Sequence, residues 1–147
     1  FPEANIKSRE LGSILQIFDE VRKKWIPHTP EEWVRQNTMH YLIHYCAIPV
    51  GLIAVEMPIK VNGMERRSDI VVHNDKGRPK MVVECKAPSV KVSQAVMDQA
   101  SRYNITLNAP YLMLTNGIKH FVFYIDFENM RTSILQEVPD YNQLLMH

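Results

Sequence analysis

Two carboxylates and an amine in the middle of the chain have residue types suited to divalent-cation chemistry. Asp69 lies about fifteen residues before Glu84, and Lys86 follows Glu84 by two positions. Carboxylate oxygens bind Mg²⁺ or Mn²⁺, which keep some waters and take phosphate oxygens as further ligands. Such an ion polarises a phosphoryl group and lowers the pKa of a bound water, and a neighbouring amine can orient or deprotonate that water. The three residues therefore form a candidate site for hydrolysis of a phosphate ester.

The hydrophobic pattern predicts the elements that must position these side chains, and it is typical of a mixed α/β sheet with helices packed on it. Apolar residues at helical spacing predict a first helix that Pro27 ends. Thr29 as N-cap and Pro30 at the first helical position predict the start of a second helix. The predicted helices cover 10–25, 29–45 and 89–107, and the predicted strands cover 53–61, 68–73, 80–86, 111–114, 118–125 and 132–136.

A hairpin between the second and third predicted strands would bring the carboxylates together. If His73 faces Lys80 across the connecting loop, Asp69 falls opposite Glu84, with Cβ atoms about 5 Å apart. Alternation along the strand puts Lys86 on the same face as Glu84. A solvated cross-strand salt bridge is the alternative. The apolar residues on both sides of the Glu84 segment count against it, because buried charges are costly unless they bind something.

Length and composition indicate one globular domain. The 147 residues are 46% hydrophobic and 22% charged, and we expect one domain over 1–147, with an N-terminal helical extension over 1–28 and a core over about 29–136. Cys46 and Cys85 lie on unrelated segments, which suits a reducing compartment rather than a disulfide framework. No apolar stretch approaches the roughly 20 residues of a membrane span, and no targeting pattern occurs. We therefore expect a cytoplasmic protein without membrane contact.

Four sequence blocks occur in a characteristic order. They are Thr29-Pro-Glu-Glu-Trp-Val-Arg-Gln36, Val82-Val-Glu-Cys-Lys-Ala-Pro88, Gln99-Ala-Ser-Arg-Tyr103 and Leu114-Thr-Asn-Gly117. Together with Asp69, this pattern resembles the PD-(D/E)XK nucleases, the restriction-endonuclease-like superfamily. The nearest likeness is to the N-terminal nuclease domains of type I restriction enzyme R subunits, the HsdR-like group, and it covers about 17–125. The resemblance implies a restriction-endonuclease-like core and a deoxyribonuclease that depends on Mg²⁺ or Mn²⁺.

The resemblance also implies a role for each residue of the central motif. Asp69 and Glu84 would be catalytic carboxylates that bind the metal, and Lys86 would be the catalytic lysine. Cys85 would lend its backbone carbonyl to the metal while its side chain packs in the interior.

Two further elements of the family pattern have matches on predicted helices. Glu32 matches the glutamate that many relatives keep on the first core helix near the metal, and Gln36 lies one turn further on the same face. Glu31 competes with Glu32 for this role, and the alternative for Glu32 is a favourable acid in the first helical turn. Gln99 and Tyr103 match the family's Q-x-x-x-Y element, whose members would contact DNA or brace the lysine. Their alternative is ordinary helix packing.

The charge balance limits how the chain could bind DNA. A formal net charge of +1 and a pI of about 8.0 are far from those of a protein that coats duplexes. Basic residues exceed acidic ones locally over 60–91, where a solvated hairpin surface is the alternative interpretation. Arg66, Arg67, Lys91 and Arg102 are the candidates for phosphate contacts, and we expect weak binding that falls steeply with salt.

Several alternatives and partners stay open. Cutting both strands of a duplex requires two sites, which suits a homodimer. The chain lacks a G-x-x-x-x-G-K-[ST] phosphate loop, so a motor or specificity subunit encoded separately is a candidate partner.

A DNA-binding or assembly module that keeps the nuclease fold without cutting is the main alternative function, and an enzyme acting on RNA or another phosphate ester is the second. His40 and His44 superficially suggest zinc, but no second ligand cluster has zinc-like spacing.

Overall fold

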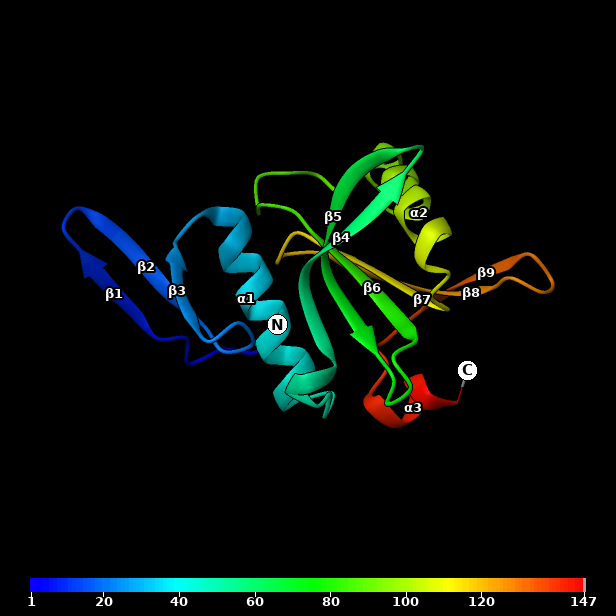
Figure 1. The fold of residues 1–147 in the computed structure, drawn as a ribbon, viewed down its shortest axis with the longest axis horizontal. Helices are drawn as coiled ribbons and strands as arrows, with labels where there is room; N and C mark the ends of the chain where they lie inside the picture. The colour runs from blue at the N-terminus through cyan, green and yellow to red at the C-terminus, as the bar shows by residue number, and fades with distance from the viewer. Residues whose placement is uncertain (147) are drawn as a thin grey trace.

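The computed structural model describes residues 1–146, apart from the side chain of Tyr103, and forms two β-sheets accompanied by α-helices (Figure 1). The elements in chain order are β1 (Ser8–Leu11), β2 (Ile14–Asp19), β3 (Lys24–Pro27), α1 (Pro30–His44), the 3₁₀ turn η1 (Val50–Leu52), β4 (Ile53–Val61), β5 (Met64–His73), β6 (Pro79–Cys85), α2 (Gln94–Leu107), β7 (Tyr111–Thr115), β8 (His120–Asp126), β9 (Arg131–Leu135) and α3 (Tyr141–Leu145).

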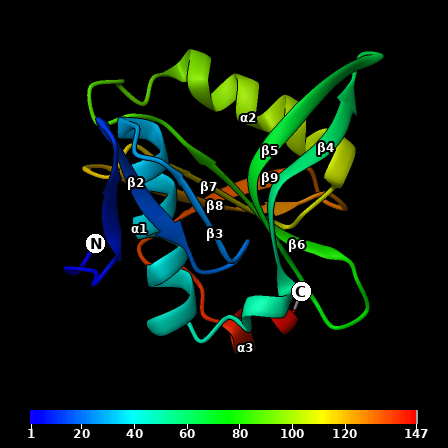
Figure 2. The ribbon, with the colours of Figure 1, turned by 60° about the vertical axis from the view of Figure 1, so that its left-hand side comes forward.

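The larger sheet is mixed, and helices cover both of its faces. Its strand order is β4-β5-β6-β7-β8-β9, and all neighbours are antiparallel except β6 and β7. This parallel pair requires a crossover, which α2 supplies. Figure 2 shows α2 on one side of the sheet and α1 and α3 on the other. The larger core packs α1 and α3 against residues such as Val72 and Met113, and the smaller core packs Ala100 of α2 against Val82 and Leu112. The predicted α/β class is therefore confirmed.

The predicted helix over 10–25 is wrong, because this segment forms the antiparallel β1–β3 sheet beside α1 (Figure 1). Gly12 has a φ of +66° in the turn between β1 and β2, a conformation that interrupts a helix and that glycine adopts at low cost. Ile17 and Ile26 pair across β2 and β3 and are buried, so the apolar residues serve a sheet rather than a helical stripe. The N-terminal extension over 1–28 is thus a small sheet, built from β-branched and aromatic residues that suit strands.

The second predicted helix is confirmed as α1. Its N-cap is Thr29, whose Oγ1 accepts the backbone N–H of Glu32 at 3.1 Å, and Pro30 occupies the first turn. The predicted strand over 53–61 is β4, and the Asn62-Gly63 pair forms the turn into β5 with φ values of +53° and +75°. These positive φ values give the turn a twist that matches the flanking strands.

The register between β5 and β6 is the predicted one next to the candidate site. Ile70 pairs with Val83, as expected. The ladder shifts just before His73, which pairs with Pro79 instead of the predicted Lys80. This irregularity lies at the loop end of the hairpin, so it leaves the site end of the ladder in register.

The remaining differences concern element ends. α2 begins at Gln94 rather than at 89, because Ser93 accepts a backbone N–H and caps the helix there. The short helix α3 was not predicted, and it begins with a capping box between Asp140 and Gln143. In the part of the chain that the structure describes, no helix is long and apolar enough to span a bilayer.

Candidate active site

Asp69 of β5 has both carboxylate oxygens engaged by hydrogen bonds. Its Oδ2 accepts the backbone N–H of Cys85 at 2.8 Å, and its Oδ1 accepts Nη2 of Arg35 at 2.9 Å. The first bond comes from the end of β6, and the second comes from α1. Asp69 is only 9% exposed, so these bonds offset the cost of burying its charge. They also fix the orientation of the carboxylate.

Glu84 of β6 lies one register step beyond the last paired residues of β5 and β6, which places it opposite Asp69. Its Oε1 accepts the Ser68 hydroxyl at 3.1 Å. Burial, the negative charge of Asp69 and a hydrogen bond with Asp69 raise the pKa of Glu84 to about 9, and Ser68 and Lys86 offset only part of this rise. Without a bound cation, burial and Asp69 therefore favour the protonated form of Glu84 at neutral pH.

Lys86 follows β6 directly, and its backbone N–H donates to the Thr115 carbonyl at 2.9 Å. Its positive charge acts on two acids, because it lowers the pKa of Glu84 and that of Glu31. Glu31 is in the first turn of α1. Removal from water and the charge of Asp69 raise the pKa of Glu31, so its net pKa lies above the ordinary value. Glu31 is thus within electrostatic range of Asp69 and Lys86.

Glu32 and Gln36 turn toward the small sheet instead. Glu32 Oε1 accepts one bond from Arg22 and one from Arg35, both at 3.0 Å. Gln36 Nε2 donates to Asp19 at 3.1 Å and to Glu32 at 3.4 Å. The geometry therefore connects Glu32 with Asp69 only indirectly, through the shared guanidinium of Arg35. The choice between Glu31 and Glu32 as the acid of α1 that serves the central pair stays a prediction.

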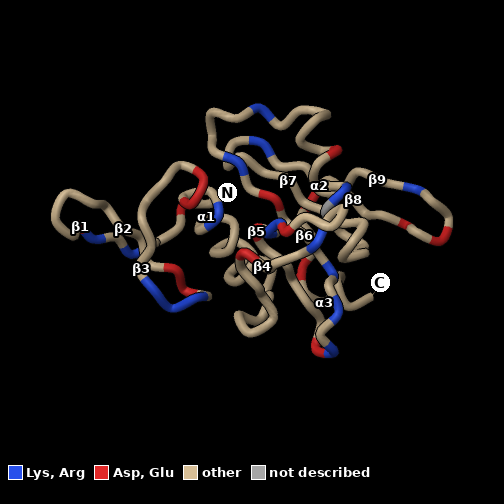
Figure 3. The backbone as a smooth tube through the Cα atoms, turned by 45° about the horizontal axis from the view of Figure 1, so that its top comes forward, with Lys and Arg blue, Asp and Glu red and all other residues tan. Residues whose placement is uncertain are grey.

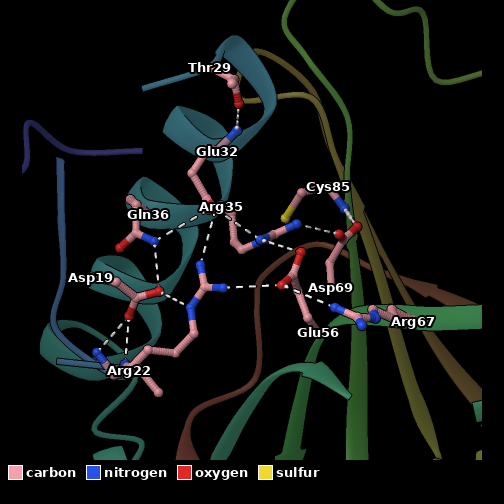
Figure 4. A network of polar contacts seen from close by, with 11 residues as sticks. Asp19, Arg22, Thr29, Glu32, Arg35, Gln36, Glu56, Arg67, Asp69 and Cys85 are labelled. Carbon is pink, nitrogen blue, oxygen red and sulfur yellow. Dashed lines mark hydrogen bonds and ion pairs between the residues drawn. The ribbon is translucent and has the colours of Figure 1, made fainter. Parts of the chain in front are cut away.

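Sequence reasoning missed an ion-pair network that adjoins the pair, shown in Figure 4. Arg35 contacts Glu32, Asp69 and Glu56, the last through Nη1 and Oε1 at 3.4 Å. Arg22 contacts Asp19, Glu32 and Glu56. The ion pair between Glu32 and Arg35 could have been predicted from the sequence, because residues three apart on a helix are neighbours. The contacts to β2 and β4 depend on tertiary structure and had no such signal.

Cys85 contributes through its backbone and its volume. Its backbone N–H holds Asp69, and its thiol is fully buried, 3.9 Å from Thr38 Oγ1. Burial holds the pKa of this thiol well above its usual range, so the side chain is an inert packing group. The role expected for its carbonyl stays a prediction.

The residues predicted to contact DNA lie on several elements. Arg66 and Arg67 are exposed on β5, Lys91 is exposed in the loop before α2, and Arg102 is exposed on α2. Gln99 is half-buried on α2. The prediction for Tyr103 concerns a side chain outside the described part of the structure. Figure 3 shows basic and acidic residues interspersed along the chain, in keeping with the small net charge.

The donor chemistry of the site suits a small divalent cation. Among the residues that the structure describes, no three His, Cys, Asp or Glu side chains come close enough together to hold a metal by themselves. Asp69 and Glu84 supply two hard oxygen donors, and Mg²⁺ commonly takes only one or two carboxylates and keeps several waters. The raised pKa of Glu84 fits this use, because a buried pair of carboxyl groups without a cation retains a proton that a cation would displace. The residues therefore fit Mg²⁺ or Mn²⁺.

Comparisons with known proteins agree with the fold and define the family. The profile of the family described as type I restriction enzyme R protein N terminus matches residues 30–139. A protein from Anabaena variabilis, described as a nuclease of the domain family DUF820, aligns with 100% of this chain and 88% of its own at 13% identity and a TM-score of 0.51, and it shares the fold. A fragment from Vibrio vulnificus, described as an HsdR subunit of a type I restriction enzyme, aligns at 24% identity and a TM-score of 0.47.

That alignment covers 64% of this chain and 20% of the Vibrio chain, so this chain spans about a fifth of the length of that relative. No curated protein sequence matches. The family profile covers most of the sequence, including the α1 block, both carboxylates, the lysine and β7. The chain belongs to the family of type I restriction enzyme R protein N-terminal regions.

Proposed function

We propose that this chain is a deoxyribonuclease module that hydrolyses phosphodiester bonds with the help of Mg²⁺ or Mn²⁺. The observation that carries the proposal is the juxtaposition of Asp69 and Glu84, which are buried and close enough that one raises the pKa of the other to about 9. A fold that needed only stability would gain from replacing such a pair, because two adjacent buried acids are costly. Membership of a restriction-enzyme family suggests that the pair binds a metal ion for DNA hydrolysis.

Each residue of the site has a defined task in this proposal. Asp69 and Glu84 hold the cation, and the first turn of α1 offers a further acid, either Glu32 or Glu31, whose pKa responds to Asp69 and Lys86. When bound, the cation supplies Lewis-acid chemistry at the phosphoryl group. Lys86 orients the attacking water and offsets the negative charge that develops on the phosphoryl oxygens. The Cys85 N–H keeps the carboxylate of Asp69 in position.

Exposed basic side chains on β5, on the loop before α2 and on α2 supply the DNA contacts in this proposal. Arg66, Arg67, Lys91 and Arg102 bind phosphates, and α2 contributes Gln99 of the Q-x-x-x-Y element. Phosphate contacts position a duplex without specifying sequence. With a net charge of +1, binding is weak and decreases steeply with salt.

Family membership suggests a wider assembly. Proteins of type I restriction systems act on DNA through several subunits, so this module would work with a motor and a specificity subunit, or as a homodimer that brings two sites to the duplex. The 147 residues contain no nucleotide phosphate loop, so any translocation comes from outside them.

A plasmid cleavage assay tests the proposal. We expect nicking or linearisation of supercoiled DNA with Mg²⁺ or Mn²⁺, none with a chelator, and none for Glu84→Ala at equal protein. Arg78→Ala is the matched control, because Arg78 is exposed in the β5–β6 loop away from the pair. Cleavage that survives Glu84→Ala contradicts the proposal, DNA binding without cleavage identifies the non-catalytic module, and cleavage of RNA alone identifies the other substrate class.

A further inference from the structure

Arg35 is a buried cation among three carboxylates. Its side chain is 7% exposed, and it reaches Asp69 at 2.9 Å, Glu32 at 3.0 Å and Glu56 at 3.4 Å. Its two terminal nitrogens make all of these contacts, and its Nε is buried without a hydrogen-bond partner among the described residues. An unsatisfied buried donor is costly, so the guanidinium is placed for its contacts with the acids rather than for its own best solvation.

Glu56 adopts an unusual backbone to meet this guanidinium. It lies within β4, yet its φ is +54°, a left-handed conformation that is rare for a non-glycine residue inside a strand. The register of β4 with β5 is regular on both sides of it, and Asp69 is the facing residue. The conformation turns the Glu56 carboxylate toward Arg35 and Arg22 (Figure 4). Backbone strain of this kind persists only where surrounding contacts impose it, and it concentrates at functional sites.

The same network extends to the small sheet. Arg22 follows β2 and contacts Glu56 at 3.2 Å and Glu32 at 3.0 Å, while its Nε contacts the fully buried Asp19 at 2.6 Å. Arg22 thereby fixes both acids that flank Arg35. Charged side-chain contacts thus connect Asp19 to Asp69 without a break, through Arg22, the two acids and Arg35.

We propose that Arg35 is a positioning residue for Asp69, with its guanidinium held in place by Glu32 and by the left-handed Glu56. The inference deepens the proposed nuclease function, on which its functional consequence rests. The planar fork of arginine can bond Asp69 with one terminal nitrogen and the two other acids with the second, which the single ammonium of a lysine cannot reproduce. The Cys85 N–H holds Asp69 Oδ2 while Arg35 holds Oδ1, and the carboxylate has further lone pairs for a cation that displaces the hydrogen bond with Glu84.

A competing explanation is that Arg35 only neutralises charge. The two explanations differ for Arg35→Lys, which keeps the charge and loses the fork. Positioning predicts weaker Mn²⁺ binding, by about 10- to 100-fold, as is typical for outer partners of ligating carboxylates. Neutralisation alone predicts unchanged affinity. Arg78→Lys makes the same chemical change at an exposed position and serves as the control.

The experiment combines two readouts on the whole chain. Mn²⁺ affinity is measured by calorimetry, and the Cys85 backbone amide is followed by NMR without metal, because its N–H donates to Asp69 and reports the orientation of that carboxylate. We expect Arg35→Lys to shift the Cys85 amide resonance and to speed its hydrogen exchange relative to Arg78→Lys. Glu56→Gln, which removes one charge that holds Arg35, is the second variant and decides the matter if Arg35→Lys does not fold.

The outcomes separate this inference from the proposed function. A shifted Cys85 amide with weakened Mn²⁺ binding supports both. A shifted amide in a protein whose wild type binds no Mn²⁺ supports the positioning of Asp69 and rejects the metal site. Arg35→Lys that melts at a lower temperature, while its folded state keeps the wild-type Cys85 amide and Mn²⁺ affinity, overturns the inference, as does Mn²⁺ binding that becomes tighter.

Discussion

Replacement of Glu84 by glutamine should stabilise the metal-free protein, and by more at higher pH. The folded-state pKa of Glu84 is raised to about 9 from an ordinary value of 4.5, chiefly by burial and by Asp69. Below pH 4.5 the carboxyl group is protonated in both states and the pKa difference has no effect. As pH rises from 4.5 to 9, the unfolded chain loses this proton while the folded protein keeps it, so wild-type stability falls. Glutamine does not ionise, and its amide can still donate to Asp69 and accept from Ser68.

The size of the effect follows from the pKa difference. Each pH unit in this window lowers the wild-type free energy of unfolding, relative to that of Glu84→Gln, by about 1.4 kcal/mol. Between pH 5 and pH 8, the advantage of the variant should therefore grow by up to about 4 kcal/mol, the limit that the full pKa difference allows. Other titrating groups are common to both proteins and cancel in the difference.

Urea denaturation at pH 5 and pH 8, with a chelator present, measures this difference. Equal slopes of the unfolding free energy against urea would show that both proteins expose the same surface, so that the midpoints compare stability. A difference between the two proteins that does not change with pH would refute the raised pKa of Glu84 and, with it, the close approach of the two carboxyl groups.

Three further variants test other parts of the structure. Thr29→Ala removes the N-cap of α1 and should lower the free energy of unfolding by about 1 kcal/mol in urea denaturation. An unchanged free energy of unfolding would contradict the cap. Met113→Ala opens a cavity in the larger core and should cost about 2–5 kcal/mol in the same measurement, and a cost under about 1 kcal/mol would contradict the packing. Lys86→Met should lower the rate of DNA cleavage by about 10²- to 10⁴-fold in single-turnover assays while DNA affinity stays near wild type. Cleavage by this variant at the wild-type rate would show that Lys86 takes no part in the reaction.

The central pair could be predicted because it depends on local rules. Once two strands joined by a short loop were inferred, alternation and pairing placed Asp69 opposite Glu84, and the irregularity at His73 lay too far along the ladder to disturb this. The start of α1 was equally local, since Thr29 and Pro30 identify a helix N-terminus by their own chemistry.

The segment before α1 could not be assigned correctly from its pattern. Its apolar residues fit a helical stripe as well as two strands, and the deciding features are the positive φ of Gly12 and the turn closed by Asp19. The choice between Glu31 and Glu32 was also undetermined, because adjacent residues in the first turn differ only in which neighbour each one faces. That neighbour is Arg22 for Glu32, and its position depends on the small sheet.

The most direct test of the proposed metal site is a calorimetric Mn²⁺ titration at pH 7 in two buffers of different ionisation enthalpy. We expect binding that releases close to one proton per ion, because Glu84 is protonated before the cation binds and ionised afterwards. The double variant Asp69→Ala, Glu84→Ala should show neither binding nor proton release. Absence of binding to the wild type, with DNA present, or binding that survives in the double variant, would contradict a cation site at Asp69 and Glu84.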